Sequence, residues 1–127
     1  MSHFFAIKPS RDGQFTNTFM YNAEPLVWSE TFPTKQGALH NANVLKIKAC
    51  FATIIDLTNG EHADGDTIEI DKSIDGQFYV RYRSNNGEIV AHSEMYTTKA
   101  NARKCAVSVR DNTADAEVRD LTSARAA

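Results

Sequence analysis

The chain contains an internal repeat, and a repeat of fixed period constrains the architecture before any single residue does. Residues 7–58 align with residues 70–122, with one residue gained or lost in the second hairpin turn. The recurring anchors are Asp12-Gly13-Gln14-Phe15 with Asp75-Gly76-Gln77-Phe78, Ser29-Glu30 with Ser93-Glu94, Thr34-Lys35 with Thr98-Lys99, and Asp56-Leu57-Thr58 with Asp120-Leu121-Thr122. The repeat indicates how the chain folds, and it leaves the function open.

The length predicts that both copies share one core. A chain of 127 residues that is 42% hydrophobic can bury a proper core. A half of ~60 residues buries only about 60% of its unfolded surface and is marginal alone. We therefore expect a single monomeric domain over residues 1–127, with repeat 1 at about 3–58, a linker at about 59–66, repeat 2 at about 67–122 and a frayed tail at 123–127.

Charge and cysteine usage exclude several classes of protein. A net charge of −2 argues against a protein that wraps polyanions, since such proteins need a basic face. No apolar run approaches the ~20 residues of a membrane span, and the start of the chain lacks the pattern of a signal peptide. We expect a cytoplasmic protein with no membrane partner. Cys105 aligns with Asn41 rather than with Cys50, so we expect neither a repeat-encoded disulfide nor a metal site, and no cofactor.

Each repeat is predicted to run strand, strand, strand, helix, strand. Alternating apolar and polar residues over 15–21 and 78–83 are typical of half-buried antiparallel strands. The other predicted strands are 4–8, 25–29 and 53–57 in the first copy, and 68–72, 89–93 and 117–121 in the second.

The turns and helix starts carry local signals. Gly13 and Gly76 follow aspartate before a strand, so we expect positive φ there. Thr34 and Thr98 are placed to cap the two helices through their hydroxyl groups. Apolar or small residues then recur at helical spacing. These positions are 38, 42, 45 and 49 in the first helix, and 102, 105, 106 and 109 in the second.

The second copy resembles a known family. Its Asp-Gly-Gln-Phe, Asn-Gly-Glu-Ile-Val-Ala, Ser-Glu-x-aromatic-x-Thr-Lys and Asp-Ala-Glu-Val-x-Asp-Leu-Thr segments, from Ile70 to Thr122, are similar to the YegP-like family of small proteins of unknown function. The first copy departs from the pattern at Asn22-Ala23-Glu24-Pro25 and at Gly37 and Asn41. The resemblance implies an α+β fold in which two tandem βββαβ repeats form one continuous, mostly antiparallel sheet. It also implies two helices on one face, exchange of the C-terminal strands between the repeats, and no established activity.

The strongest repeated signal lies between the third strand and the helix of each copy. It comprises Ser29, Glu30, Thr34 and Lys35 in the first copy, and Ser93, Glu94, Thr98 and Lys99 in the second. A structural interpretation makes it a strand-to-helix corner, where threonine caps the helix and glutamate contacts lysine or the helix start. A functional interpretation makes it a twin anion site at two helix N-termini. We favour the structural interpretation, because a glutamate beside the helix start repels an anion.

Catalytic and metal motifs are weak, so we expect no catalytic residue and no metal ligand. His92 and Ser93 are neighbours on a strand and therefore point to opposite faces, which prevents a nucleophile–base pair. His62, Asp64 and Asp66 could hold a cation loosely, but they lie in the polar linker and have no counterpart in the other copy.

An exposed sheet face is the candidate binding surface. If the helices cover one face, the residues alternating with the apolar ones point outward: Tyr79, Arg81, Arg83, Thr16, Thr18 and Met20. Aromatic and arginine side chains on an open sheet can bind bases, a protein or a small ligand; the plain alternative is a solvated face. We expect a non-enzymatic binding module for an unknown protein or small molecule. The alternatives are a weak single-stranded nucleic-acid binder through this face, and then a small-molecule enzyme.

Overall fold

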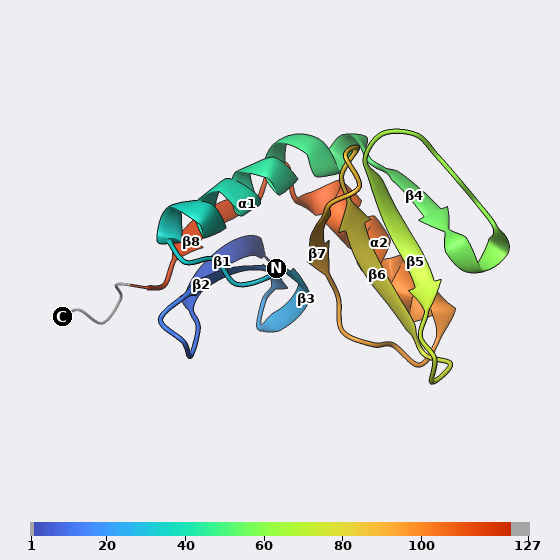
Figure 1. Ribbon diagram of the computed structural model, residues 1–127, viewed down its shortest axis with the longest axis horizontal. Helices are drawn as coiled ribbons and strands as arrows, with labels where there is room; N and C mark the ends of the chain where they lie inside the picture. Colours follow the sequence, from blue (N-terminus) through green and yellow to red (C-terminus); the bar gives the residue numbers. More distant parts are fainter. Residues whose placement is uncertain (1, 123–127) are drawn as a thin grey trace.

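The computed structural model describes residues 2–122, which form an α+β fold with one mixed, mostly antiparallel sheet and two α-helices (Figure 1). The strands are β1 (His3–Pro9), β2 (Phe15–Tyr21), β3 (Glu24–Trp28), β4 (Thr53–Asp56), β5 (Thr67–Lys72), β6 (Phe78–Arg83), β7 (Ile89–His92) and β8 (Glu117–Asp120). The helices are α1 (Lys35–Lys48) and α2 (Lys99–Asn112), with short 3-10 turns η1 (Ala49–Phe51) and η2 (Leu57–Asn59). The predicted elements are therefore all present, and no strand end differs from its predicted position by more than one residue.

The strand order places the last strand of each half beside the first strand of the other. The order is β4-β5-β6-β7-β3-β2-β1-β8. Strand β8 runs parallel to β1, with Phe5 opposite Val118, and β4 runs parallel to β5, with Ile54 opposite Ile68. The other neighbouring strands pair antiparallel. Each edge of the sheet is thus closed by a strand that arrives from the far half.

Both helices lie on one face of this sheet. Helix α1 packs against β1 and β2, and α2 packs against β5 and β6 (Figure 1). The Thr34 hydroxyl accepts from the Gly37 amide and the Thr98 hydroxyl from the Asn101 amide, both at 3.1 Å, so both predicted N-caps are confirmed. The predicted apolar stripes are also confirmed, because every one of their positions is buried: Ala38, Ala42, Leu45, Ala49, Ala102, Cys105, Ala106 and Val109.

The hairpin turns follow the predicted glycine chemistry. Gly13 and Gly76 have φ of 76° and 84°, a region that glycine enters without steric cost. Each turn aligns the strands on either side so that aromatic and aliphatic residues face the helices. The inward side chains of both halves then form a single core cluster that includes Phe5, Phe19, Ile68, Val80 and Tyr82.

The two halves of the sheet meet at a single residue pair. Strand β3 pairs with β7 only through Trp28 and His92. On either side of this junction a β-bulge interrupts the strand: Leu26 in β3 and Val90 in β7 have no partner in the β2 and β6 registers. Bulges bend a strand and increase its local twist. Within residues 2–122, β3 and β7 are joined at the Trp28–His92 pair alone.

Residues 2–122 contain no helix long and apolar enough to cross a membrane. The frayed tail expected at 123–127 lies outside the described residues.

The edge pairing gives a direct test. Deleting the chain from Glu117 onward removes the parallel partner of β1 and the Asp120 partner of Lys35. We expect the amide NMR signals of β1 and of the first turn of α1 to shift strongly relative to a chain ending at Thr122. Shifts confined to residues near the end of α2 would contradict the pairing.

Candidate ligand-binding cleft

The repeated serines hold the third strands in place. The Ser29 hydroxyl accepts from the Asn17 amide at 3.0 Å and donates to the Glu30 carbonyl at 2.7 Å. The Ser93 hydroxyl does the same with the Val80 amide, at 2.9 Å, and the Glu94 carbonyl, at 2.8 Å. Both serines are buried, so their role here is structural.

The repeated lysines pair with aspartates of the opposite half, not with the neighbouring glutamates. Lys35 contacts Asp120 and Lys99 contacts Asp56, each at 2.9 Å. The glutamate–lysine contact, one of the two contacts expected for this glutamate, is therefore not formed within residues 2–122, because the pairing of β8 with β1 and of β4 with β5 brings an aspartate to each lysine. Glu30 is exposed and forms no ion pair within residues 2–122.

These aspartates are held in their charged form. Burial alone raises the pKa of Asp56, but hydrogen bonds from Thr58 and Lys99, together with the Lys99 charge, outweigh it and leave the pKa below its ordinary value. Hydrogen bonds from Thr122 and Lys35 lower the pKa of Asp120 to about 2. Each Asp-Leu-Thr segment thus ends a half by fixing a strand to the opposite helix.

The arginines of the predicted outer-face site are already engaged. Arg81 and Arg83 each place Nε 2.7 Å from a carboxylate oxygen of Glu69, which is only 5% exposed. Arg81 also contacts Asp71 at 2.9 Å, and its Nη1 atom donates a hydrogen bond to the Tyr79 hydroxyl oxygen at 2.8 Å. Strand β5 therefore supplies two carboxylates that neutralise the basic group of β6.

The Glu69 cluster is balanced electrostatically. Burial raises the pKa of Glu69, but hydrogen bonds from Arg83 and Arg81 outweigh it and lower the net value. Burial lowers the pKa of Arg81, and the hydrogen bond to Glu69 with the nearby negative groups more than restores it, so the pKa lies above its ordinary value. A phosphate approaching Arg81 must compete with these carboxylates.

The first-half members of the predicted outer-face site lie apart from the arginines. Thr18 is paired with Trp28, which is paired with His92, which is paired with Arg81. With neighbouring strands about 4.8 Å apart, Thr18 and Arg81 are separated by roughly 14 Å. Thr16 is half-buried, whereas Thr18 and Met20 are only 6% and 8% exposed, so the expectation that these two side chains are open to solvent is wrong.

The histidine motifs do not assemble a catalytic group. Ser93 is buried against Val80, while His92 is exposed and its ring lies 5.1 Å from that of Trp28. In the linker, Asp66 accepts from the Tyr82 hydroxyl at 2.5 Å and from the Asn85 amide at 2.8 Å. Across residues 2–122, no group of three or more histidine, cysteine, aspartate or glutamate side chains is arranged to hold a metal ion.

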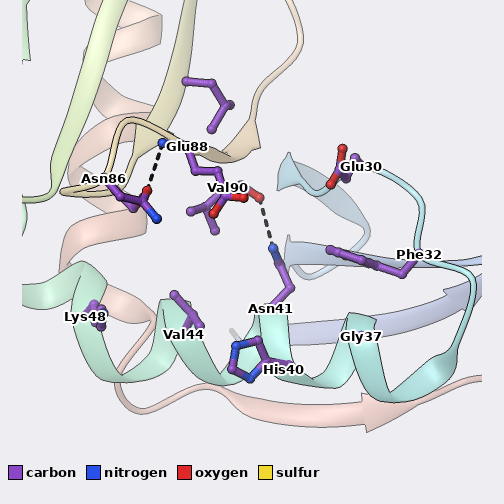
Figure 2. A pocket seen from close by; sticks show the side chains of 12 residues that line it. Glu30, Phe32, Gly37, His40, Asn41, Val44, Lys48, Asn86, Glu88 and Val90 are labelled. Carbon is purple, nitrogen blue, oxygen red and sulfur yellow. Dashed lines mark hydrogen bonds between the residues drawn. The ribbon is translucent and has the colours of Figure 1, made fainter.

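A cleft lies between α1 and the β6–β7 hairpin, and we call it the α1–hairpin cleft (Figure 2). Its volume is about 650 Å³, within the range of small-ligand sites. The lining residues combine charged, amide and apolar groups: Glu30, Phe32, Gly37, His40, Asn41, Val44, Lys48, Ser84, Asn86, Glu88, Ile89 and Val90. The cleft is therefore built by a helix of the first half and a hairpin of the second.

A pair of asparagines holds the floor of this cleft. Asn17 Nδ2 donates to Asn41 Oδ1 at 2.8 Å. Asn41 Nδ2 in turn donates to the carbonyl of the bulged residue Val90 at 3.0 Å (Figure 2). Asn17 is 1% exposed, and its Oδ1 atom has no hydrogen-bond partner. The side-chain amide of Asn41 thus links α1 to β7 by a hydrogen bond and not by an apolar contact.

A glycine on α1 gives room for an aromatic wall. A Cβ atom added at Gly37 would lie 3.0 Å from Cβ of Phe32 and 3.2 Å from its ring. Such contacts are too short to be tolerated without movement, so Gly37 allows Phe32 to lie close to the helix. This glycine is tied to the shape of the cleft, not to positive φ.

The equivalent cleft of the other half is smaller and differently lined. It lies between α2 and the β2–β3 hairpin and measures about 430 Å³. Here Tyr96 replaces Phe32, and Cys105, whose Sγ lies 3.5 Å from the Leu26 carbonyl, replaces Asn41. The pKa of Cys105 is raised to about 11, mainly by burial, so this thiol stays protonated at neutral pH. The two clefts therefore have different chemistry.

Ionisable side chains of both signs line the larger cleft without ion-pair partners. Among residues 2–122, Glu30, Glu88 and Lys48 form no salt bridge, and His40 forms no hydrogen bond or ring contact. One signal for this site is visible in the sequence, because Gly37 and Asn41 are the helix positions at which the first copy departs from the pattern of the second. The cleft itself was missed.

Comparisons with known proteins agree on one group of unknown function. A model described as a domain of unknown function (DUF1508) matches residues 73–120. A UPF0339 protein of Pseudomonas aeruginosa is 28% identical over 117 residues, covering 91% of this chain and 94% of that protein. A UPF0339 protein of Caulobacter vibrioides is 34% identical over 59 residues, covering 46% of this chain and 100% of that protein. The solution NMR structure of YegP from E. coli, a protein of unknown function, is similar in fold, with a TM-score of 0.74 at 23% identity over 96% of this chain and 95% of that one.

The Glu69 cluster predicts unequal effects of its arginines. Arg81→Ala removes the partner of both Glu69 and Asp71, and we expect it to lower the free energy of unfolding by roughly 1–3 kcal/mol. Arg83 is more exposed than Arg81, and Arg83→Ala leaves the Arg81–Glu69 ion pair in place. We therefore expect Arg83→Ala to lower the free energy of unfolding by at most about 1 kcal/mol. Urea unfolding measures both. Equal losses within error would contradict this arrangement.

The lowered carboxylate pKa values predict the direction of acid sensitivity. Asp56 and Glu69 have folded pKa values below those of the unfolded chain, so their stabilising contribution is complete above about pH 5 and is lost as the pH falls through the folded values. We expect the urea midpoint to fall between about pH 5 and pH 2, and to fall less steeply in Asp56→Asn. As a control, Glu94→Gln alters an exposed carboxylate and should keep the wild-type slope. An unchanged slope in Asp56→Asn would be inconsistent with its ion pair.

Proposed function

The chain belongs to the YegP-like (UPF0339) family of unknown function, and we propose that it is a non-enzymatic binding module whose small ligand occupies the α1–hairpin cleft. The observation that carries the proposal is the combination of a cavity of about 650 Å³ with unpaired ionisable groups of both signs. A ligand there contacts both halves of the protein at once.

The buried asparagines support this choice of site. A buried polar atom without a partner costs about 1–3 kcal/mol, and apolar pairs at such positions avoid that cost. The other half shows that the fold accepts the apolar solution, because Val80 and Cys105 stand where Asn17 and Asn41 stand in the first half. A polar floor under one cleft alone is expected where that cleft has a binding role, since functional sites often retain locally unfavourable choices.

The outer sheet face has weaker support as the binding surface. Arg81 and Arg83 are engaged by Glu69, and Thr18 and Met20 are buried. The single-stranded nucleic-acid alternative needs free cationic groups beside stacking platforms. We therefore place the ligand in the cleft.

We also infer that the chain is a tandem pair of βββαβ units, about 3–58 and 67–122 with a linker at about 59–66, which exchange their last strands within one domain. The pairings of β8 with β1 and of β4 with β5 support this inference. So does the Caulobacter relative, whose full length matches 46% of this chain. Because the second unit supplies the partner for the first, we propose that the protein acts as a monomer. Its free thiols, Cys50 and Cys105, fit a reducing compartment, which supports a cytoplasmic location.

The test fills each cleft in turn. Val44 lines the α1–hairpin cleft and Ser108 lines the equivalent cleft, and the two residues occupy matching positions on α1 and α2. The wild-type protein, Val44→Trp and Ser108→Trp are incubated with the small-molecule fraction of a bacterial extract and analysed by native mass spectrometry. We expect Val44→Trp to lose the bound mass and Ser108→Trp to retain it, with thermal unfolding confirming that both variants are folded.

Two outcomes would overturn the proposal. One is undiminished ligand mass in folded Val44→Trp. The other is the absence of any bound small molecule in the wild-type protein across extracts from different growth conditions.

A further inference from the structure

The α1–hairpin cleft is a trough that follows the helix axis. Gly37, His40, Asn41, Val44 and Lys48 recur at spacings of three or four residues, so they lie along one face of α1. At a rise of about 1.5 Å per residue, the helix length from position 37 to position 48 is roughly 16 Å. Figure 2 shows these side chains spread along α1 beneath the β6–β7 hairpin. The trough is thus long enough for an elongated ligand.

The trough has opposite charges at its two ends. Glu30 and Phe32 precede α1, whereas Lys48 is the last residue of the helix, and Figure 2 shows Glu30 and Lys48 at opposite ends of the cleft. Neither Glu30 nor Lys48 takes part in an ion pair in the part of the chain that the structure describes. A carboxylate favours a cationic group at the first end, and an ammonium favours an anionic group at the second.

The middle of the trough combines apolar groups with hydrogen-bonding groups, which include Asn41 and Asn86. Val44 projects from α1, and Ile89 and Val90 lie on β7. The carboxylates of Glu30 and Glu88 disfavour a polyanion such as an oligonucleotide. The ligand that matches is long, carries both apolar and hydrogen-bonding groups in its middle, and is oppositely charged at its ends.

We propose, building on the binding function assigned to this cleft, that its ligand is a short extended peptide with free termini. Extended chains advance about 3.3 Å per residue, so the trough matches about four or five residues. The peptide ammonium group lies at Glu30 and its carboxylate at Lys48. Small or apolar peptide side chains lie between Val44 and the β7 wall.

The test uses tetra-alanine, whose termini are both charged at neutral pH. Titration followed by amide NMR gives the affinity for the free peptide, its N-acetyl form and its C-terminal amide. We expect each blocked form to bind about threefold to fivefold more weakly, as for exposed ion pairs.

Variants assign each terminus to its residue. Glu30→Gln is expected to lower the affinity for free tetra-alanine by a similar factor and to leave the affinity for the N-acetyl form unchanged. Lys48→Met is expected to lower the affinity for free tetra-alanine and to leave the affinity for the C-terminal amide unchanged. The matched control is Glu94→Gln, which alters the equivalent glutamate of the other half and should change no affinity. Both lining residues are exposed, so these substitutions should leave the fold intact.

The peptide proposal and the binding function fail in different ways. If tetra-alanine shifts no cleft resonance, or if blocking its termini has no effect, the peptide assignment is overturned, while extract capture that depends on Val44 still supports the cleft. If Val44→Trp leaves extract capture unchanged, the binding function itself is overturned.

Discussion

The parallel pairing of β8 with β1 and of β4 with β5 is the constraint on which the structure depends. Each half alone is close to the size at which a single core is marginal. The two edge strands cover that deficit by adding hydrogen bonds and apolar contacts from the opposite half. They also carry Asp120 to Lys35 and Asp56 to Lys99, so each edge strand is fixed to a helix of the opposite half. The two halves therefore fold against each other, and α1 comes to face a hairpin of the other half.

The clefts follow from how the sheet is joined at its centre. Within residues 2–122, a single pair, Trp28 with His92, connects β3 and β7, and bulges at Leu26 and Val90 bend these two strands beside it. One opening is occupied by Tyr96 and Cys105, and it is the smaller. The other retains Phe32, Gly37 and the Asn17–Asn41 pair, and it remains larger and polar at its floor. The same backbone thus produces two clefts of different chemistry.

Local signals in the sequence predicted much of the fold. The glycines at 13 and 76 and the capping threonines at 34 and 98 act within a few residues of themselves, so their roles were readable from the chain. Contacts between segments that are distant in the sequence could not be predicted in this way. The alternation of side chains predicted that Arg81 lies on the outer face, but its pairing with Glu69 depends on the register between β5 and β6. Likewise, Lys35 contacts Asp120, which lies 85 positions away in the sequence. The cleft depends on a bulge at Val90 and on the position of the Phe32 ring, and neither leaves a periodic signal; Gly37 and Asn41 were visible only as departures from the repeat.

Amide NMR mapping of the labelled protein, with the small-molecule fraction of a bacterial extract, distinguishes the larger cleft from the outer sheet face as the proposed ligand site. If the cleft is the site, the largest shifts cluster at Asn41, Val44 and Val90, with little change at Leu26 and Cys105. Shifts centred on Trp28, Tyr79 and Arg81 would place binding on the outer sheet face and would contradict the proposed site.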